Sequence, residues 1–483
     1  MPFNTFPFLI FLTVVACGYG LIRRGLGWPW SQAWLLAASL FFYVYARPWN
    51  LPLLLGSIAF NWAIARAMMR QTDDRRRKML LWVGLAANIT LLFFFKRVGV
   101  FVDLVAFLHG PRFTPHWGLP LGVSFFTFTQ IMYLLDAFPR PPTSPAALEI
   151  YKGLTHPNSP FEHATFVSLF PYVASGPLVK ARSVVSQLHQ YVANEPPLAR
   201  ASRGIFIFSL GLAKKVVLAD AFAPIADAGF GAQRDFTMAE AWVFCLAAVL
   251  HLYFDFSGYS DMAVGAAWML GIDIPQNFNA PLRARSVTEF WQRWHISLSH
   301  FITDYLYKPL LRAMPRRNAA TSAVATVLSM AIAGLWHGPQ WTYVAWGLSH
   351  GSALAVNQVW KGRNLRMPDA VGWLLTSVFV ISTIVFLRAA NVPEALHMMT
   401  RLLPHENPTG MEALRHLLPF SPTLILRPVT IGVVAAYLFK SSDQLSKAFQ
   451  PTVLTAAVSA TLIVVSVFFM NTAPARTFVY FGF

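Results

Sequence analysis

Long apolar segments recur along the whole 483-residue chain, and this repetition restricts the possible folds more than any other feature. A helix needs about 20 residues to cross a bilayer core of about 30 Å, where its backbone polar groups must be paired internally. The segments are residues 6–22, 32–46, 51–69, 79–95, 119–138, 205–222, 241–254, 319–336, 341–356, 371–387, 424–439 and 453–470. They predict an all-α polytopic membrane protein with about ten to twelve helices, some of them short enough to be re-entrant or interfacial.

The charge distribution supports the same class of protein. Hydrophobic residues make up 55% of the chain and charged residues 12%, although the formal net charge is +17. In a soluble domain this charge would suggest nucleic acid, but here the basic residues cluster between apolar segments, as in loops retained in the cytoplasm. We therefore expect contact with a lipid bilayer and no nucleic acid. Arg23, Arg24 and the run at 70–78 are predicted to be cytoplasmic, which places the N-terminus on the opposite side.

No internal repeat, low-complexity tract or soluble domain interrupts this pattern. Two polar stretches, residues 139–163 and 404–421, are expected to be loops or linkers between apolar segments. The prediction is a single membrane-embedded domain covering residues 1–483.

One apolar stretch is too long for a single perpendicular span. From residue 241 to 272 the chain stays largely apolar, and one helix of that length would measure about 48 Å, so it must break or tilt steeply. Its polar interruption contains Asp255, Ser257, Gly258 and Asp261, with the glycine at the expected bend. A carboxylate at mid-bilayer costs about 2.5–3.5 kcal/mol, so both aspartates need partners at a helix end or arginine, or else a water-filled cavity.

A second polar stretch follows at residues 277–299 and begins with Asn277. Ser286 precedes Glu289 by three residues, a capping-box pattern that predicts a helix start. Trp291 and His295 would then share one face of this helix. The stretch fits either an interfacial amphipathic helix with tryptophan anchors or a functional position for His295.

A third stretch, at residues 334–341, contains a histidine where a helix is expected to stop. Gly338 and Pro339 end the helix directly after His337, so this side chain either enters a cavity between spans or makes a structural hydrogen bond. Neutral histidine is suited to general-base work, and His295 and His337 together suggest acyl or proton transfer. No metal site is expected, because neither a His-Glu-x-x-His motif nor a cysteine cluster is present.

These motifs together resemble the membrane-bound O-acyltransferase family. The resemblance rests on Leu-Tyr-Phe-Asp-Phe-Ser-Gly-Tyr-Ser-Asp-Met at 252–262, on the block at 277–299 with Arg293-Trp294-His295, and on Gly-Leu-Trp-His-Gly at 334–338. Further landmarks at 119–126, 170–177, 214–220, 346–351, 386–389 and 478–483 extend it over most of the chain. The sequence is most similar to the bacterial alginate O-acetyltransferase branch, which also contains the membrane protein of teichoic-acid D-alanylation.

The resemblance implies a ring of tilted helices around a thin core with a central tunnel. His337 matches the histidine regarded as catalytic, and His295 matches a second histidine whose role is less settled. The residues expected to line the tunnel or the substrate are Asp255, Ser257, Asp261, Asn277, Trp291, Arg293 and Trp336.

The implied activity is passage of an acetyl group across the bacterial inner membrane. The donor would be cytosolic acetyl-CoA, used as a substrate with no bound cofactor, and the acceptor an exported polysaccharide of the alginate, cellulose or peptidoglycan type. A periplasmic acetyltransferase is the usual partner, and the N-terminus of this chain would be periplasmic. Alternatives are transfer of D-alanyl or another acyl group, and a polysaccharide or lipid transporter.

Two departures from the family pattern affect the expected contacts. After Tyr307 the family continues through a glycine-rich turn, whereas residues 308–317 here are basic and contain two prolines. These cations suit coenzyme A phosphates if the loop is cytosolic. Lys180 stands where the family has arginine, which loses bidentate geometry.

Overall fold

A computed structural model describes residues 1–46, 48–96, 119–139, 159–189, 197–230, 237–338, 340–404, 422–472 and 476–479. Regular secondary structure within these ranges is entirely helical, which confirms the predicted all-α class. Most of the loops predicted at 139–163 and 404–421, and Pro339, lie outside the described residues. The contacts between residues divide the chain into two compact units. The prediction of one membrane domain stays a prediction.

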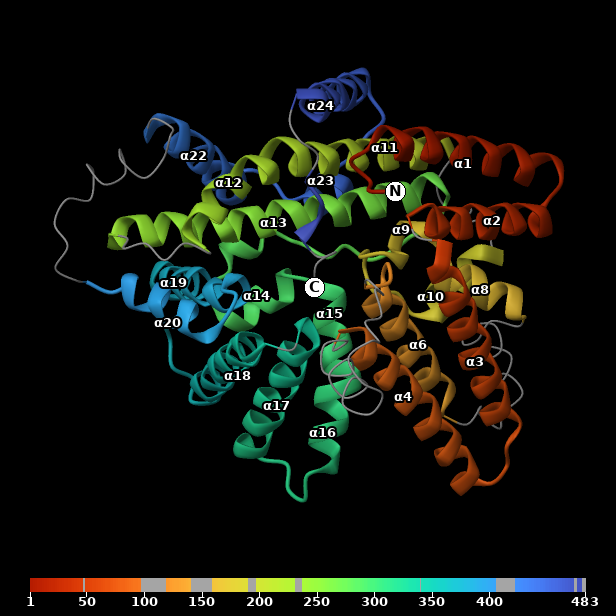
Figure 1. The fold of residues 1–483 in the computed structure, drawn as a ribbon, viewed down its shortest axis with the longest axis horizontal. Helices are drawn as coiled ribbons and strands as arrows, with labels where there is room; N and C mark the ends of the chain where they lie inside the picture. Colours follow the sequence, from red (N-terminus) through yellow and green to blue (C-terminus); the bar gives the residue numbers. More distant parts are fainter. Residues whose placement is uncertain are drawn as a thin grey trace, which may run out of the picture. The chain divides into compact units, whose positions relative to one another are not determined.

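The first unit comprises residues 1–209, 260–275 and 450–460. Its helices α1 to α4 pack in chain order, and α6 lies beside α3 and α4 (Figure 1). The bounds are α1 (Phe6–Gly25), α2 (Trp28–Ala46), η1 (Pro48–Asn50), α3 (Leu51–Arg70), α4 (Asp74–Lys96), α6 (Val123–Ala137), α8 (Pro160–Ser168), α9 (Phe170–Val173), α10 (Ala181–His189) and most of α11 (Pro197–Ala213).

Helix α1 shows why these segments suit a bilayer. Phe8, Phe11 and Val15 recur at helical spacing and are buried against the rest of the unit. Ile10 and Val14, on other faces, are 66% and 54% exposed. Such apolar exposure is unfavourable in water but fits contact with lipid tails, so the outer faces of α1 are lipid-facing surfaces.

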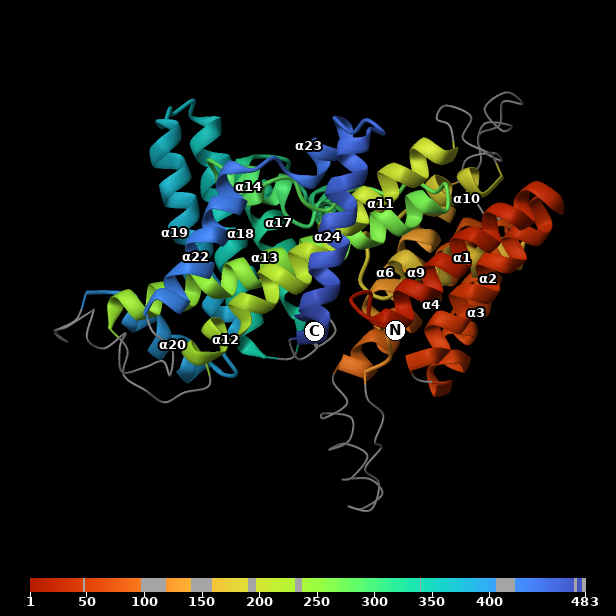
Figure 2. The ribbon, with the colours of Figure 1, turned by 90° about the horizontal axis from the view of Figure 1, so that it is seen from above.

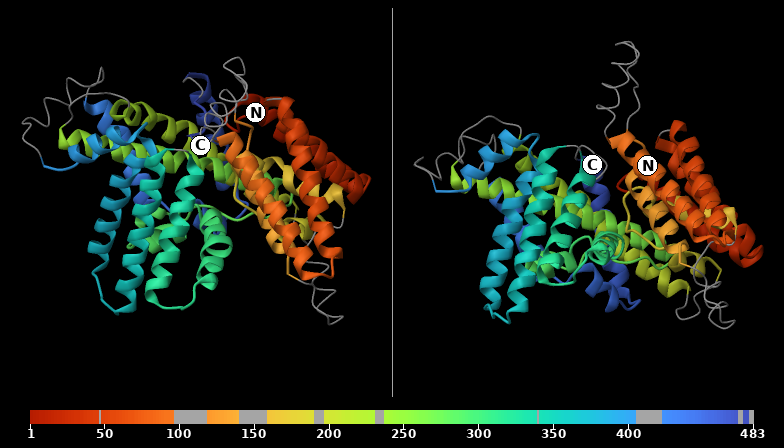
Figure 3. Two further views of the ribbon diagram at one scale, coloured as in Figure 1. Left: turned by 60° about the horizontal axis from the view of Figure 1, so that its bottom comes forward. Right: turned by 90° about the horizontal axis from the view of Figure 1, so that it is seen from below.

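The second unit comprises residues 210–259, 276–449 and 461–483. Its helices α17, α18 and α19 run side by side (Figures 2 and 3). The bounds are η2 (Lys214–Ala219), α12 (Asp220–Gly229), most of α13 (Met238–Met269), η3 (Pro281–Arg283), α14 (Val287–Arg293), α15 (Ile296–Phe301), η4 (Ile302–Tyr307), α16 (Lys308–Ala313), α17 (Ala319–His337), α18 (Trp341–Gly362), α19 (Asp369–Arg388), α20 (Val392–Arg401), α22 (Pro422–Leu438), α23 (Ser442–Lys447) and the later part of α24 (Val453–Thr472).

Glycines bring α17 and α18 into close contact. A Cβ on Gly334 would lie 2.3 Å from the carbonyl oxygen of Tyr343, and one on Gly347 would lie 2.4 Å from that of Met330. Small residues at such crossings let helix backbones approach within a membrane. The close packing of this hairpin fixes the end of α17 against the start of α18, where the candidate site lies.

Helix α13 is continuous over 32 residues, from Met238 to Met269. The predicted break at Gly258 is therefore wrong, and tilt remains the way to fit this helix into a bilayer. The glycine serves packing instead, because a Cβ there would lie 2.7 Å from the carbonyl oxygen of Gly211 on α11. Of the residues in the most apolar 18-residue segment of α13, 83% are buried, so this helix lies in the protein interior.

Within the described ranges, 7 helices are long and apolar enough to cross a membrane. They are Phe6–Gly25, Pro48–Arg70, Asp74–Lys96, Met238–Met269, Ala319–His337, Asp369–Arg388 and Val453–Thr472. The other predicted segments also contain helices, but these are shorter or less apolar, as with the 15-residue α6 and the 17-residue α22. The protein is thus a multi-pass membrane protein.

Candidate functional site

His337 is the last residue of α17, which ends where the Gly-Pro pair predicted. Its side chain is buried, with the residue only 4% exposed. The imidazole lies 4.6 Å from the ring of Trp336 and meets the ring of Trp346 edge-on at 5.0 Å. An imidazole at a helix end, enclosed by aromatic rings, is shielded from bulk water.

The aromatic cluster around Trp346 extends away from His337. Trp346 lies 5.7 Å from Trp291 of α14 and 4.8 Å from His350, its neighbour on α18. The indole Nε1–H of Trp291 donates a hydrogen bond of 3.2 Å to Nδ1 of His350. The structure thus joins two predicted site residues, His337 and Trp291, through Trp346 and His350, which the sequence interpretation did not select. A third predicted residue, Trp336, packs directly on His337.

His295 lies at the junction of α14 and α15 and is 1% exposed. The predicted helix begins as expected, because the Ser286 hydroxyl accepts a hydrogen bond of 3.2 Å from the Glu289 N–H. It ends at Arg293, however, so the prediction that Trp291 and His295 share a helix face is wrong. His295 adopts the left-handed conformation, with φ of 42° and ψ of 54°, which costs a non-glycine residue roughly 1–2 kcal/mol.

Asn277 explains why the helix stops there. Its carbonyl oxygen accepts a hydrogen bond of 3.0 Å from Ile296 N–H, and its side-chain Oδ1 accepts one of 3.1 Å from Ser297 N–H. Asn279 N–H donates to the carbonyl of Arg293 at 3.0 Å, on the other side of His295. The segment at 277–279 therefore holds the turn that contains His295, with Asn277 itself fully buried.

The environment of His295 keeps its imidazole neutral. The ring of Phe256, on α13, meets it edge-on at 4.7 Å. His295 lies outside the helices long enough to span the membrane, and burial lowers its pKa to about 3 because desolvation disfavours the charged form. Neutral imidazole has one donor and one acceptor nitrogen, so His295 is able to accept a hydrogen bond near neutral pH.

Arg293, predicted to line the tunnel, is held by its own helix. It forms a 2.6 Å ion pair with Glu289, one turn earlier on α14. The same carboxylate accepts a 2.7 Å hydrogen bond from Arg285 N–H, through its other oxygen. Arg293 and Glu289 thus brace the short α14 helix that carries Trp291.

Asp255 has a buried cationic partner that the sequence interpretation did not identify. Lys215, fully buried in the six-residue π-helix η2, lies 2.6 Å from Asp255 and 2.8 Å from Asp220. The second oxygen of Asp255 accepts a 2.9 Å hydrogen bond from Val479 N–H, and the ring of Phe478 lies 4.9 Å from the ammonium. Asp255 therefore joins α13, η2 and the segment at 476–479.

The two remaining residues predicted on α13 are also buried. Ser257 is 0% exposed, and its hydroxyl makes no hydrogen bond within the part of the chain that the structure describes. Asp261 is 2% exposed and belongs to the first unit, whereas the histidines belong to the second. The structure therefore places Ser257, but not Asp261, in the same unit as His295.

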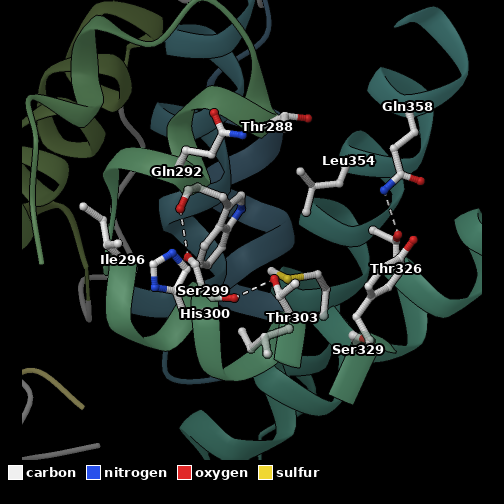
Figure 4. Close-up of a pocket in the computed structure, with 14 residues that line it drawn as sticks. Thr288, Gln292, Ile296, Ser299, His300, Thr303, Thr326, Ser329, Leu354 and Gln358 are labelled. Atoms are coloured by element: carbon white, nitrogen blue, oxygen red, sulfur yellow. Dashed lines mark hydrogen bonds between the residues drawn. The ribbon is translucent and has the colours of Figure 1, made fainter. Parts of the chain in front are cut away.

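A cavity of about 430 Å³ adjoins this cluster, between α14, α15 and η4 and the helices α17 and α18. Figure 4 shows Thr326, Leu354 and Gln358 on one side of it and Gln292, Ile296 and Ser299 on the other. The other lining residues are Thr288, Trp291, His300, Ile302, Thr303, Tyr307, Ser329 and Met330. Met330 lies on α17 about two turns before His337 and on the same face, so the cavity wall and this histidine are about 10 Å apart along the helix.

In this helical, multi-pass membrane protein, the buried histidines are the side chains suited to acid–base chemistry. In the described residues no group of three or more His, Cys, Asp and Glu side chains is arranged to hold a metal ion. The profile of MBOAT, the membrane-bound O-acyltransferase family, matches residues 124–392, which include both histidines and the cavity. The chain belongs to this family and is an O-acyltransferase.

Relatives of known name agree with this assignment. A peptidoglycan O-acetyltransferase from Helicobacter pylori is 33% identical over 100% of this chain and 97% of its own length. A probable alginate O-acetylase, AlgI, from Pseudomonas aeruginosa is 34% identical over 82% of this chain and 74% of its own. A teichoic acid D-alanyltransferase from Streptococcus thermophilus is 28% identical over 50% of this chain and 57% of its own.

Proposed function

We propose that this protein transfers acetyl groups from cytosolic acetyl-CoA, across the bacterial inner membrane, for O-acetylation of an exported polysaccharide. Full-length similarity to a peptidoglycan O-acetyltransferase and similarity to alginate O-acetylases support the acceptor class. The observation that carries the proposal is the placement of His337, buried at the end of a helix whose same face lines the cavity.

His337 acts as the general base in this proposal. It takes the proton of an acceptor hydroxyl while the new C–O bond forms at the acetyl carbonyl carbon, and the C–S bond of the thioester then breaks. The departing thiolate recovers that proton from the imidazolium, so the reaction consumes no net proton. A thioester is already activated, so positioning and exclusion of water by Trp336 and Trp346 supply much of what remains.

The cavity of about 430 Å³ suits the thioester arm of the donor. Mostly apolar walls with a few hydroxyl and amide groups are typical of small-molecule sites. The loop expected at 308–317 begins as helix α16, with Arg312 in its last turn. Arg312, and Arg316 and Arg317 between α16 and α17, are exposed and offer cations for the phosphates of coenzyme A. This assignment puts the 308–317 segment, Arg23, Arg24 and the 70–78 run in the cytosol and the N-terminus in the periplasm.

A periplasmic acetyltransferase is the partner that completes the proposed transfer. The acetyl ester formed on the acceptor hydroxyl leaves the site on the periplasmic side. The partner then transfers the acetyl group from this ester to a hydroxyl of the polymer, which regenerates the acceptor hydroxyl. The relationship to a teichoic acid D-alanyltransferase, which covers half of the chain, favours D-alanyl transfer as the second candidate.

The test uses the full-length protein in lipid nanodiscs with radiolabelled acetyl-CoA and a peptidoglycan or alginate acceptor, with and without the candidate partner. We expect thioester loss and label transfer in the wild type, loss of both in His337→Ala and His337→Gln, and normal turnover in His397→Ala on α20. Label that stays on the wild type, but not on His337→Gln, after rapid denaturation at neutral pH, and that mild acid then releases, would replace the general-base role with an acyl-histidine. Turnover only with a D-alanyl carrier would select the second candidate, and solute movement that survives His337→Gln would indicate a transporter.

A further inference from the structure

His350 is a buried histidine that is not among the predicted site residues. It connects the aromatic cluster at His337 with the wall of the cavity. It lies on α18 and is 2% exposed. Trp291 Nε1–H donates to its Nδ1 at 3.2 Å, and the hydroxyl of Thr383, on α19, lies 3.2 Å from its Nε2. Both ring nitrogens therefore have partners, one on the cavity wall and one on a neighbouring helix.

These partners fix the tautomer of His350. An indole N–H only donates, so Nδ1 must be the unprotonated, accepting nitrogen. The proton then sits on Nε2, which donates to the hydroxyl oxygen of Thr383. That hydroxyl in turn donates to the carbonyl of Phe379 at 2.8 Å, which completes a consistent chain of hydrogen bonds. His350 is held as a neutral imidazole with a defined orientation.

The ring of His350 also lies next to the tryptophan that packs on His337. Trp346 lies 4.8 Å from His350 and 5.0 Å from His337, between the two imidazoles. Trp291, bonded to His350, lines the cavity of about 430 Å³. His350 thus touches both the tryptophan that packs on His337 and the tryptophan that forms the cavity wall.

Packing and hydrogen bonds both act on the His350 ring. A second cavity of about 30 Å³ is lined by His350 together with Phe290, Trp346 and Thr383. The two hydrogen bonds select one ring orientation among those that the apolar contacts allow, because turning the ring over would separate both nitrogens from their partners.

We propose that His350 is a positioning residue for acyl transfer: its Nδ1 holds Trp291 in the cavity wall, and Trp291 in turn packs on Trp346, which lies against His337. The functional part of this inference rests on the proposed role of His337. The structural part, which is the hydrogen bond to Trp291 and its effect on the His337 ring, is measurable without any acyl donor.

The first experiment measures structure by NMR on the full-length protein with ¹⁵N-labelled tryptophan indoles and histidines. Trp291→Phe and His337→Gln identify the two relevant signals. We expect His350→Phe to shift the Trp291 indole signal toward that of an unbonded N–H and to move the His337 ring signals. His397→Phe, the matched control on α20, should move neither signal. An unchanged Trp291 or His337 signal in His350→Phe would overturn the proposal.

The second experiment tests the two hydrogen bonds of His350 one at a time, with amide side chains of different length. An asparagine amide replaces Nδ1 and keeps an acceptor for Trp291, whereas a glutamine amide replaces Nε2 and keeps only the partner at Thr383. We expect His350→Phe and His350→Gln to lower kcat about tenfold, the loss of about one hydrogen bond, with KM for the donor changing less. His350→Asn should restore most of kcat and the His337 NMR signal.

The double variant His350→Phe/Trp291→Phe completes the test. If His350 acts through this hydrogen bond, the double variant should lose no more kcat than the worse single variant. Equal losses in His350→Asn and His350→Gln, or additive losses in the double variant, would reduce His350 to a packing role. A wild type inactive with acetyl-CoA would contradict the proposed donor, and the NMR rescue by His350→Asn would still decide the positioning role.

Discussion

Asn277 holds the backbone directly after His295 through two hydrogen bonds, to Ile296 N–H at 3.0 Å and to Ser297 N–H at 3.1 Å. These bonds retain a left-handed conformation at His295 that would otherwise cost roughly 1–2 kcal/mol. Backbone strain of this kind persists only where surrounding contacts enforce it, and it aims the imidazole toward Phe256 on α13. Asn277 is predicted to line a tunnel. In the structure, its hydrogen bonds orient His295.

Replacement of Asn277 by alanine should therefore impair activity more than folding. Asn277→Ala leaves the buried Ser297 N–H without its acceptor, a cost of about 1–3 kcal/mol that relaxation of the His295 turn can reduce. Thermal unfolding and kcat in nanodiscs measure the two effects. Wild-type kcat in Asn277→Ala would contradict a positioning role.

The variant His295→Asn removes the imidazole but keeps the backbone conformation, since asparagine tolerates the left-handed region. We expect near-wild-type stability at pH 8 with reduced kcat. The folded pKa of about 3 lies below the usual 6.5, so the unfolded state binds more protons between these values. The contribution of His295 to stability is thus complete above pH 6.5 and lost as pH falls toward 3. Unfolding temperatures measured from pH 8 to pH 4 should fall less steeply in His295→Asn.

The buried Lys215 ammonium should be essential for stability as long as its carboxylate partners remain. Lys215→Met leaves Asp255 with an uncompensated buried charge, and breaking such a pair costs about 3–5 kcal/mol. The double variant Lys215→Met/Asp255→Asn should recover most of this loss, because the fully buried carboxylate is then neutral and only Asp220, whose side chain is 13% exposed, loses its cation. Denaturant unfolding in detergent would compare the three proteins. A single variant as stable as the double would show that the pair is not coupled in this way.

The donor role of the cavity predicts a selective change in KM. Leu354 lines the cavity from α18, and Leu354→Trp reduces its volume without adding charge. We expect KM for acetyl-CoA to rise about tenfold with little change in unfolding temperature, the pattern of lost binding. Leu348→Trp on the same helix, at a position 43% exposed, is the matched control. Equal KM values in both variants would place the donor elsewhere.

The sequence predicted best what depends on local pattern. Long apolar segments marked the helices, Ser286 and Glu289 marked the start of α14, and Gly338 marked the end of α17 at His337. Each of these features involves neighbours in the chain, whose effect on the backbone is governed by capping and by helix-breaking residues.

The features that the sequence did not predict depend on residues far apart in the chain. The turn at His295 is set by Asn277, and Asp255 is neutralised by Lys215, whose position inside an apolar segment was the available signal. His350 was visible only as part of a family motif, and its bond to Trp291 arises from tertiary packing. Hydrogen bonds between distant segments have no local pattern from which to derive them.

Substitution of Gly258 tests whether helix α13 is continuous or bent at this residue. In a bent helix, Gly258→Ala would straighten the chain at little cost. In the continuous helix, the new Cβ would lie 2.7 Å from the carbonyl oxygen of Gly211 and 3.1 Å from Lys215 N, so α11 and η2 must move away. Such overpacking typically costs about 1–3 kcal/mol.

The expected result for Gly258→Ala is a lower unfolding temperature, together with loss of activity because the displaced η2 carries Lys215 away from Asp255. Gly56→Ala, in helix α3 with nothing within 4 Å of the added Cβ, is the matched control and should be neutral or slightly stabilising. A Gly258→Ala protein as stable as Gly56→Ala would mean that α13 bends at this glycine in the membrane.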